Sequence, residues 1–250
     1  MKSKDTVTFE VCDFIGIISL NDPPSNELAL PEFISIDLFK QWTSSKSLKG
    51  LIIKGEGKNF SAGGKLDVIF NACEDPDDLE HLLHDGLLLL KHIQDLDIPV
   101  IAAINRVCFG GGLEIALACH IRVASVNALL AFPEANQNLM PGMGGTTRLP
   151  AYAGFSQSAK IILGGDLVSA TDAKNLGFVD YIAPKDLAFE FSWTLMQKMT
   201  HDRPVNVIRS IMQALKNSAE LPQDDAMIEE TRLFCSLAQD EAMRRKTEEA

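Results

Sequence analysis

The stretch from Pro99 to Glu134 constrains the fold of this chain more than any other part of the sequence. It begins with a short apolar run, Pro99–Ile104, which is typical of a strand buried in a parallel sheet. Three consecutive glycines, 110–112, follow, and the next segment, Leu113–Cys119, is so apolar that it predicts a helix buried on all sides. A buried strand that leads through glycines into a buried helix favours an α/β fold.

Two further apolar runs, Ile121–Ala124 and Leu129–Phe132, complete this stretch, and we expect them to form a pair of strands that run out and return. Such a pair would bring two acids together, Glu114 in the first turn of the helix and Glu134 after the second strand. The first amides of a helix have no partner inside it, so the glycine turn offers donors to a developing negative charge. From these residues alone, Glu114 either serves chemistry at this turn or caps its own helix.

The remaining sequence alternates between short apolar strands and helical segments, as expected for the same fold class. The expected strands are 7–12 and 15–20, which form a hairpin, 50–54 and 178–182. The expected helices are 31–44, 66–96 with a break at Asp75 and Pro76, 146–163 and 170–176.

The character of the sequence changes at Asp186, after which helical patterns replace strands. Three amphipathic helices are expected there, at 186–200, 204–217 and 224–247. We therefore expect a core at 1–185 that contains the functional site, and a C-terminal helical region at 186–250. The apolar stripes of that region, from Phe189 to Met196 and from Val207 to Ile211, predict that it serves oligomerisation.

The composition excludes several classes of protein. The net charge of −11 argues against general binding to nucleic acid or to a membrane surface, both of which need a basic face. No apolar run approaches the roughly 18 residues of a membrane span, and the N-terminal segment lacks the apolar core of a signal peptide. The five cysteines are odd in number and show no CxxC spacing, so we expect reduced thiols and a cytoplasmic location.

Motifs for several other chemistries are absent or incomplete. Gly63-Gly64-Lys65 resembles a fragment of a P-loop, but Leu66 stands where that loop needs serine or threonine. The sequence contains no GxGxxG opening a helix, no GxSxG and no HExxH. His81 and His84 have a spacing that a metal ion can use, but a solvated helix face is the simpler interpretation. We expect neither a metal nor a redox cofactor.

Several motifs occur in the order in which one enzyme family carries them. They are KNFSAGG at 58–64, PVIAAIN at 99–105, GGGLE at 110–114, FPE at 132–134, PGMGGTTRLP at 141–150 and the stretch from Gly165 to Asp180. Together they make the chain resemble the crotonase, or enoyl-CoA hydratase/isomerase, superfamily over almost its whole length. Collinear motifs are far more specific than any one of them.

The resemblance implies a crotonase-like spiral of ββα units with a C-terminal helical tail, assembled as a homotrimer or hexamer. It implies an acyl-CoA thioester as substrate, and an oxyanion hole made by the amides of Gly64 and Gly111. Glu114 and Glu134 match the two acids of the family's hydratases, in which one acid activates the water that attacks C3 and the other delivers a proton to C2. By the same resemblance, the substrate-binding residues are Leu28, Ala62, Lys65, Leu66, Pro133 and Gly142.

Retention of both acids favours an enoyl-CoA hydratase, which adds water across a 2,3 double bond. One alternative is a Δ3-Δ2-enoyl-CoA isomerase, or a dehydratase or decarboxylase on a CoA or carrier-protein thioester. Another is a non-catalytic scaffold with the same fold. The sequence departs from the family's pattern at Lys65 and His120, which stand in place of acids, and at Arg106, which stands in place of glycine. Glu27 is unfavourable beside anionic CoA, so a carrier-bound phosphopantetheine thioester is a second candidate substrate.

Overall fold

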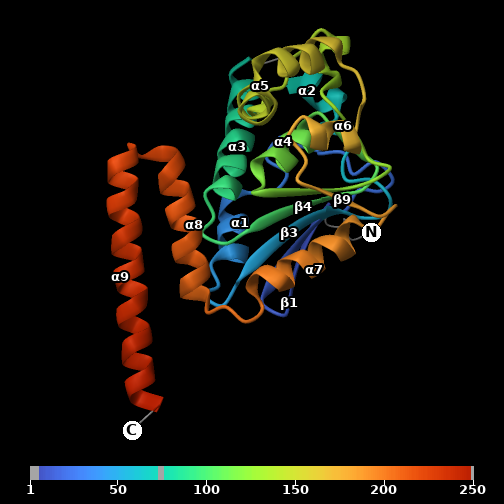
Figure 1. Cartoon of the computed structure of the whole chain (residues 1–250). Helices are drawn as coiled ribbons and strands as arrows, with labels where there is room; N and C mark the ends of the chain where they lie inside the picture. The colour runs from blue at the N-terminus through green and yellow to red at the C-terminus, as the bar shows by residue number, and fades with distance from the viewer. Residues whose placement is uncertain (1–5, 73–75, 249–250) are drawn as a thin grey trace.

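The computed structural model describes residues 6–72 and 76–248, and a six-stranded sheet with the order β1-β2-β3-β4-β6-β9 forms its centre (Figure 1). The strands are β1 (Val7–Cys12), β2 (Ile15–Leu20), β3 (Gly50–Gly55), β4 (Val100–Ile104), β6 (Ile121–Ser125) and β9 (Tyr181–Ala183). Strands β1 and β2 pair antiparallel, and every other neighbouring pair in this sheet is parallel. The expected α/β class and the N-terminal hairpin are confirmed.

Helices cover both faces of this sheet. Helices α1 (Ile36–Thr43), α3 (Pro76–Gln94) and α4 (Gly111–Ala118) lie on one face, and α7 (Ala188–Thr200) packs on the other (Figure 1). Within β3, Leu51 and Ile53 belong to the core on the first face, whereas Ile52 belongs to the core under α7. Successive strand residues point to opposite faces, so a strand covered on both sides reads as a continuous apolar run.

A second sheet of three short strands lies beside the first and corrects one prediction. Its order is β5-β7-β8, with β5 (Val107–Phe109), β7 (Leu129–Ala131) and β8 (Val168–Ser169). The runs 121–124 and 129–132 do not form a pair that runs out and returns, because β6 belongs to the large sheet and β7 to the small one. Strand β6 already has β4 and β9 on its two edges, so β7 pairs in parallel with β5 instead.

Several helix boundaries also differ from the prediction. The helix expected at 31–44 begins only at Ile36, because Ser35 is extended and its hydroxyl caps the helix by accepting a hydrogen bond from the Leu38 amide. The expected break at Asp75 falls on residues 73–75, which lie outside the described chain. The remaining helices of the core are α2 (Leu66–Ala72), η1 (Pro133–Gln137), α5 (Gly145–Gly164), which is kinked at Gly154, and α6 (Ala170–Asn175).

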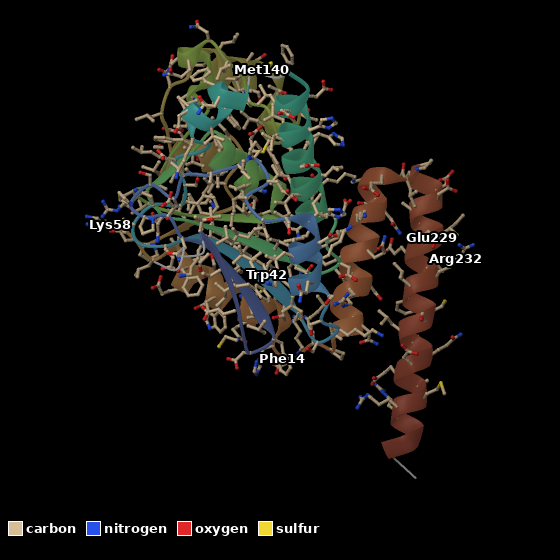
Figure 2. The ribbon with its side chains drawn as sticks, turned by 180° about the vertical axis from the view of Figure 1, so that it is seen from behind. Phe14, Trp42, Lys58, Met140, Glu229 and Arg232 are labelled. Carbon is tan, nitrogen blue, oxygen red and sulfur yellow. The ribbon has the colours of Figure 1, made fainter. Side chains whose placement is uncertain are left out.

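The C-terminal region contains the three expected helices, but they differ in their surroundings. The apolar residues of α7, among them Phe189 and Met196, pack on the chain's own sheet. The prediction that this stripe serves oligomerisation is therefore wrong for α7. Helices α8 (Val205–Glu220) and α9 (Gln223–Glu248) form a hairpin, and α9 stands apart from the sheet layers (Figures 1 and 2). Among the described residues, no helix combines the length and the apolar character needed to cross a membrane.

Candidate active site

The loops that follow β5 and β7 carry the two candidate acids to the same place. Phe109 pairs with Ala131 across the two parallel strands, and the amide of Gly110 donates to the Ala131 carbonyl at 3.0 Å. Helix α4, with Glu114, begins directly after β5, and η1, with Glu134, begins directly after β7. The carboxyl ends of adjacent parallel strands lie at the same edge of a sheet, so this pairing accounts for the convergence of the two acids.

Glu114 is a buried carboxylate that is held by a distant loop. Its side chain is only 2% exposed, and its Oε1 accepts hydrogen bonds from the amides of Met143 at 2.7 Å and Gly145 at 2.8 Å. These bonds contradict the alternative in which Glu114 caps its own helix. Burial raises the pKa of Glu114, and the two amide hydrogen bonds and the charge of Arg148 act in the opposite direction. Within the described chain no hydrogen bond reaches Oε2, which leaves that oxygen available to a water molecule.

Glu134 lies beside the glycine turn and is half-buried. Gly110 has φ +50°, a conformation that favours glycine, and a Cβ atom there would lie 3.0 Å from Glu134 Oε1. Its Oε2 is buried and has no hydrogen-bond partner in the described part of the chain. Burial and the nearby Glu114 raise the pKa of Glu134 to about 7. Glu134 therefore carries a proton readily near neutral pH, whereas on Glu114 the two amide hydrogen bonds and Arg148 partly offset the effect of burial.

The candidate oxyanion loop is tied to β5 on one side and to Leu28 on the other. Ser61 accepts a hydrogen bond from the Phe109 amide at 2.9 Å, which fixes the loop alongside β5. The Gly63 carbonyl accepts from the Leu28 amide, and the Lys65 amide donates to the Leu28 carbonyl. Amides alternate in direction along an extended segment, so the intervening Gly64 amide points away from Leu28.

The amides of Gly64 and Gly111 lie close to each other. A Cβ atom on Gly111 would lie 3.7 Å from the Gly64 nitrogen. Gly111 is also the first residue of α4, where an amide has no partner inside the helix. No hydrogen bond among the described residues uses either amide. The arrangement can therefore offer two donors to one oxygen atom of a ligand.

The structure brings one predicted substrate-binding residue directly to these glycines. Leu28 places its Cδ1 3.2 Å from the Cβ position of Gly111. Lys65 instead forms an ion pair with Asp22 at 2.9 Å, and the hydrogen bond and charge of Asp22 raise the pKa of Lys65. Ala62 donates its amide to the Ser25 carbonyl.

The other predicted substrate-binding residues lie along the same loops. Leu66 is an exposed residue that opens α2, and Pro133 precedes Glu134 in η1. Gly142 is exposed and lies against α3, where its Cβ position would be 3.1 Å from Cδ2 of Leu83. Among the described residues, no side-chain hydrogen bond or ion pair joins Leu66, Pro133 or Gly142 to Glu114 or Glu134.

The sequence did not reveal the role of the loop that holds Glu114. Arg148 supports this loop, because its Nη1 donates to the Met143 carbonyl at 2.7 Å and its Nε donates to Gln94 Oε1 at 3.1 Å. The signal available was the motif at 141–150, which contains Met143, Gly145 and Arg148. The role of this motif depends on hydrogen bonds to Glu114, about 30 residues away in the sequence. A local sequence pattern cannot predict such long-range contacts.

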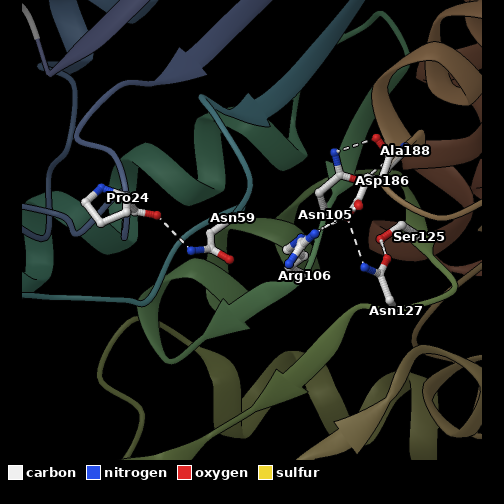
Figure 3. A network of polar contacts seen from close by, with 8 residues as sticks. All are labelled: Pro24, Asn59, Asn105, Arg106, Ser125, Asn127, Asp186 and Ala188. Atoms are coloured by element: carbon white, nitrogen blue, oxygen red, sulfur yellow. Dashed lines mark hydrogen bonds and ion pairs between the residues drawn. The ribbon is translucent and has the colours of Figure 1, made fainter.

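Arg106 and His120, two residues that differ from the family's pattern, both form polar contacts within the chain. Arg106 forms an ion pair with Asp186, from Nε to Oδ1 at 2.9 Å and from Nη2 to Oδ2 at 3.0 Å, and Asn127 donates to the same Oδ1 (Figure 3). This network joins the turn after β4 to the segment before α7. His120 accepts a hydrogen bond from the Val100 amide on Nδ1, and its Nε2 faces the Gln94 carbonyl at 3.0 Å. Burial lowers the pKa of His120, which is consistent with a neutral ring in this position.

The site contains no obvious place for a metal ion. In residues 6–72 and 76–248, no three His, Cys, Asp or Glu side chains gather closely enough to hold one. His81 and His84 are exposed on α3. The described residues bring two carboxyl groups and two backbone donors together at the site.

Comparisons with known proteins identify the family of the chain. The profile of the enoyl-CoA hydratase/isomerase family matches residues 12–249. A probable enoyl-CoA hydratase of Bacillus subtilis is 32% identical over 235 residues, which cover 92% of this chain and 89% of the relative. The alpha subunit of a fatty acid oxidation complex from Idiomarina loihiensis is 34% identical over 227 residues, which cover 86% of this chain but only 32% of the subunit.

Solved structures give the same result. The crystal structure of an enoyl-CoA hydratase from Bacillus anthracis is 26% identical to this chain, with a TM-score of 0.83 and coverage of 96% of each chain. On the family profile and on the 32% identity to a relative of matching length, the chain belongs to the enoyl-CoA hydratase/isomerase family.

Proposed function

We propose that this chain is an enoyl-CoA hydratase that adds water across the 2,3 double bond of a 2-enoyl-CoA thioester. The observation that carries the proposal is a pair of buried carboxyl groups whose pKa values are both raised but whose hydrogen-bond partners differ. Glu114 receives two backbone hydrogen bonds that favour its charged form, whereas burial and Glu114 raise the pKa of Glu134 to about 7. Hydration needs one group that accepts a proton and another that donates one, within reach of the same substrate.

In the first step, the amides of Gly64 and Gly111 bind the thioester carbonyl oxygen. The thioester carbonyl oxygen accepts both hydrogen bonds and becomes more negative as the enolate forms. Preorganised donors at a helix N-terminus stabilise that charge without reorganisation during the reaction. The position of Gly111 at the start of α4 therefore favours this role.

The two glutamates then move the protons. Glu114, through its free Oε2, accepts a proton from a water molecule as the water oxygen forms a bond to C3. The electrons of the double bond pass to C2 and the carbonyl, and the protonated Glu134 delivers its proton to C2. The product is a 3-hydroxyacyl thioester, and solvent exchange restores the starting protonation of both acids. Because Glu134 must begin with its proton, we expect the rate of hydration to decline as the pH rises above about 7.

The same proposal includes the setting of the enzyme. The reaction transfers no electrons, and we propose that it uses neither a metal nor a redox cofactor. We propose a homotrimer or hexamer, and a cytoplasmic location in which the described cysteines remain thiols, as the free thiols of residues 12, 108, 119 and 235 support.

The test compares hydration with isomerisation. We expect wild type to hydrate crotonyl-CoA, followed by loss of ultraviolet absorbance, and Glu114→Gln and Glu134→Gln each to lower this rate by about 10²–10⁴. The double variant should be little worse than the worse single one, because the acids act as a unit. Glutamine keeps the side-chain volume, so circular dichroism should not change. Wild type that isomerises 3-enoyl-CoA but hydrates no 2-enoyl-CoA, with one glutamine variant still active, would identify an isomerase instead.

A further inference from the structure

Met143 extends its side chain from the loop that holds Glu114 into the space beside the glycine turn. Its Cε lies 3.1 Å from the Cβ position of Gly111, the proposed oxyanion residue, and its backbone amide donates to Glu114 Oε1. The side chain is only 5% exposed. A single residue therefore contacts both the candidate base and the candidate oxyanion hole.

Helix α3 provides a recess for this methionine. The Met143 sulfur lies 2.7 Å from the position that a Cβ would occupy on Gly86, so any larger residue at position 86 would displace the methionine. Gly86 is buried on α3. The side chain thus spans the distance from α3 to α4 and is confined at both ends.

A second apolar side chain approaches the same point. Leu28 places its Cδ1 3.2 Å from the Cβ position of Gly111 and is 4% exposed. Leu28 and Met143 therefore both contact the residue whose amide would bind the thioester carbonyl. Two apolar side chains therefore pack against Gly111.

The proposed reaction fixes where the acyl chain must pass. The carbonyl oxygen lies at the amides of Gly64 and Gly111, and C3 lies next to the Glu114 carboxylate. Carbons beyond C3 must leave through the surroundings of that carboxylate, where Met143 is already packed. A long, unbranched thioether fills irregular gaps in a protein interior, and the volume that it fills is not available to a substrate.

We propose that Met143 is the residue that limits the acyl chain, so that the enzyme accepts short 2-enoyl thioesters with few carbons beyond C3. The proposal rests on the hydratase function given above and specifies its substrate class. One methylene too many in an apolar pocket lowers kcat/KM by roughly 10–200-fold. Crotonyl-CoA should therefore be a much better substrate than 2-decenoyl-CoA.

The test measures kcat/KM for crotonyl-CoA, 2-hexenoyl-CoA and 2-decenoyl-CoA with four proteins. Wild type should prefer crotonyl-CoA over 2-decenoyl-CoA by at least about tenfold. Met143→Ala should reduce this preference by about tenfold or more. Met143→Leu, which shortens the side chain but keeps most of its apolar volume, should reduce it by less. Met140→Ala is the matched control, because Met140 is an exposed methionine of the same loop (Figure 2), and it should keep the wild-type preference.

Binding of saturated thioesters separates this inference from the proposed function. Calorimetry with butyryl-CoA and decanoyl-CoA reports the chain-length preference even if the protein hydrates nothing. A wild-type protein with no hydratase activity would overturn the proposed function, whereas a shift toward decanoyl-CoA in Met143→Ala would still support a chain-limiting role. Equal preference for the two chain lengths in wild type, or the same preference in wild type, Met143→Ala and Met143→Leu, would overturn the inference.

Discussion

Helices α4 and α9 differ sharply in how completely they bury their apolar side chains. Every residue of α4 from Gly111 to Ala118 is buried, including the charged Glu114. In α9, at least half of each large apolar side chain at positions 227, 228, 234 and 243 is exposed, and Phe234 reaches 69%. Helix α9 makes its contacts with α8 and extends away from the sheet (Figures 1 and 2).

Helix α8 is intermediate between these extremes. A cavity of about 1000 Å³ lies between α8 and the core, and its walls include Ile211 and Leu215 from the tail and Leu117 and Arg148 from the core. The site region buries its apolar side chains within the core, whereas many large apolar side chains of α8 and α9 stay exposed in the described chain. This is the surface that we propose for assembly.

The largest expected effect contrasts the stability of the two regions. Phe60→Ala removes a fully buried ring and should lower the free energy of unfolding by about 3–5 kcal/mol. Phe234→Ala in the tail should change it by less than about 0.5 kcal/mol in dilute solution, where the chain is not assembled. Urea unfolding measures both values. Comparable losses would show that α9 packs on the core of its own chain.

The second prediction concerns the site alone. Gly111→Pro removes one proposed oxyanion donor and should lower turnover by about 10²–10³. Proline is tolerated at the first position of a helix, but its Cβ would lie 3.1 Å from Met143 Cε and 3.2 Å from Leu28 Cδ1, so circular dichroism checks the fold and Gly111→Ala, which keeps the amide, is the matched control. Full activity in a folded Gly111→Pro protein would place the oxyanion hole elsewhere.

The third prediction concerns the tail alone. Phe234→Asp places a charge on the proposed assembly surface and should weaken self-association by about 30-fold, the effect of losing a contact worth roughly 2 kcal/mol. Phe14→Asp is the control, because Phe14 is 56% exposed on the N-terminal hairpin of the core (Figure 2). Light scattering over a concentration series measures both. A wild-type chain that remains a 27.4 kDa monomer at micromolar concentration would contradict the proposed assembly.

The smallest expected effect concerns the positive charge of Arg148 near Glu114. Arg148 lowers the pKa of Glu114, so Arg148→Met should raise that pKa and move the acid limb of the kcat/KM profile to higher pH. Turnover at neutral pH should fall about fivefold, since one charge across partly solvated protein is worth roughly 1 kcal/mol. Glu134 also faces Glu114 and stays in place in this variant. Lys160→Met, at an exposed position on the same helix, should leave the profile unchanged, and an unchanged profile in Arg148→Met would reject the electrostatic role.

Local patterns in the sequence were sufficient for the fold class, the N-terminal hairpin and most helices. A strand covered on both faces must be apolar at consecutive positions, so Gly50–Lys54 and Val100–Ile104 are recognisable without a structure. The glycines at 110–112, the acids at 114 and 134 and the collinear motifs marked the family, which the comparisons confirm. The roles of these residues remain predictions for the experiments above.

Only the tertiary structure decided how these parts meet. Strands of two or three residues, such as β5 and β8, are too short to carry a pattern, and their pairing with β7 is what brings Glu134 beside Gly110. The Met143 amide reaches Glu114 across 29 residues of sequence, and the raised pKa of Glu134 depends on burial by several segments. The apolar face of α7 packs on its own sheet, whereas large apolar side chains of α9, such as Phe234, do not. A sequence records which side chains are apolar or charged, but the surface that each one contacts depends on how distant segments pack together.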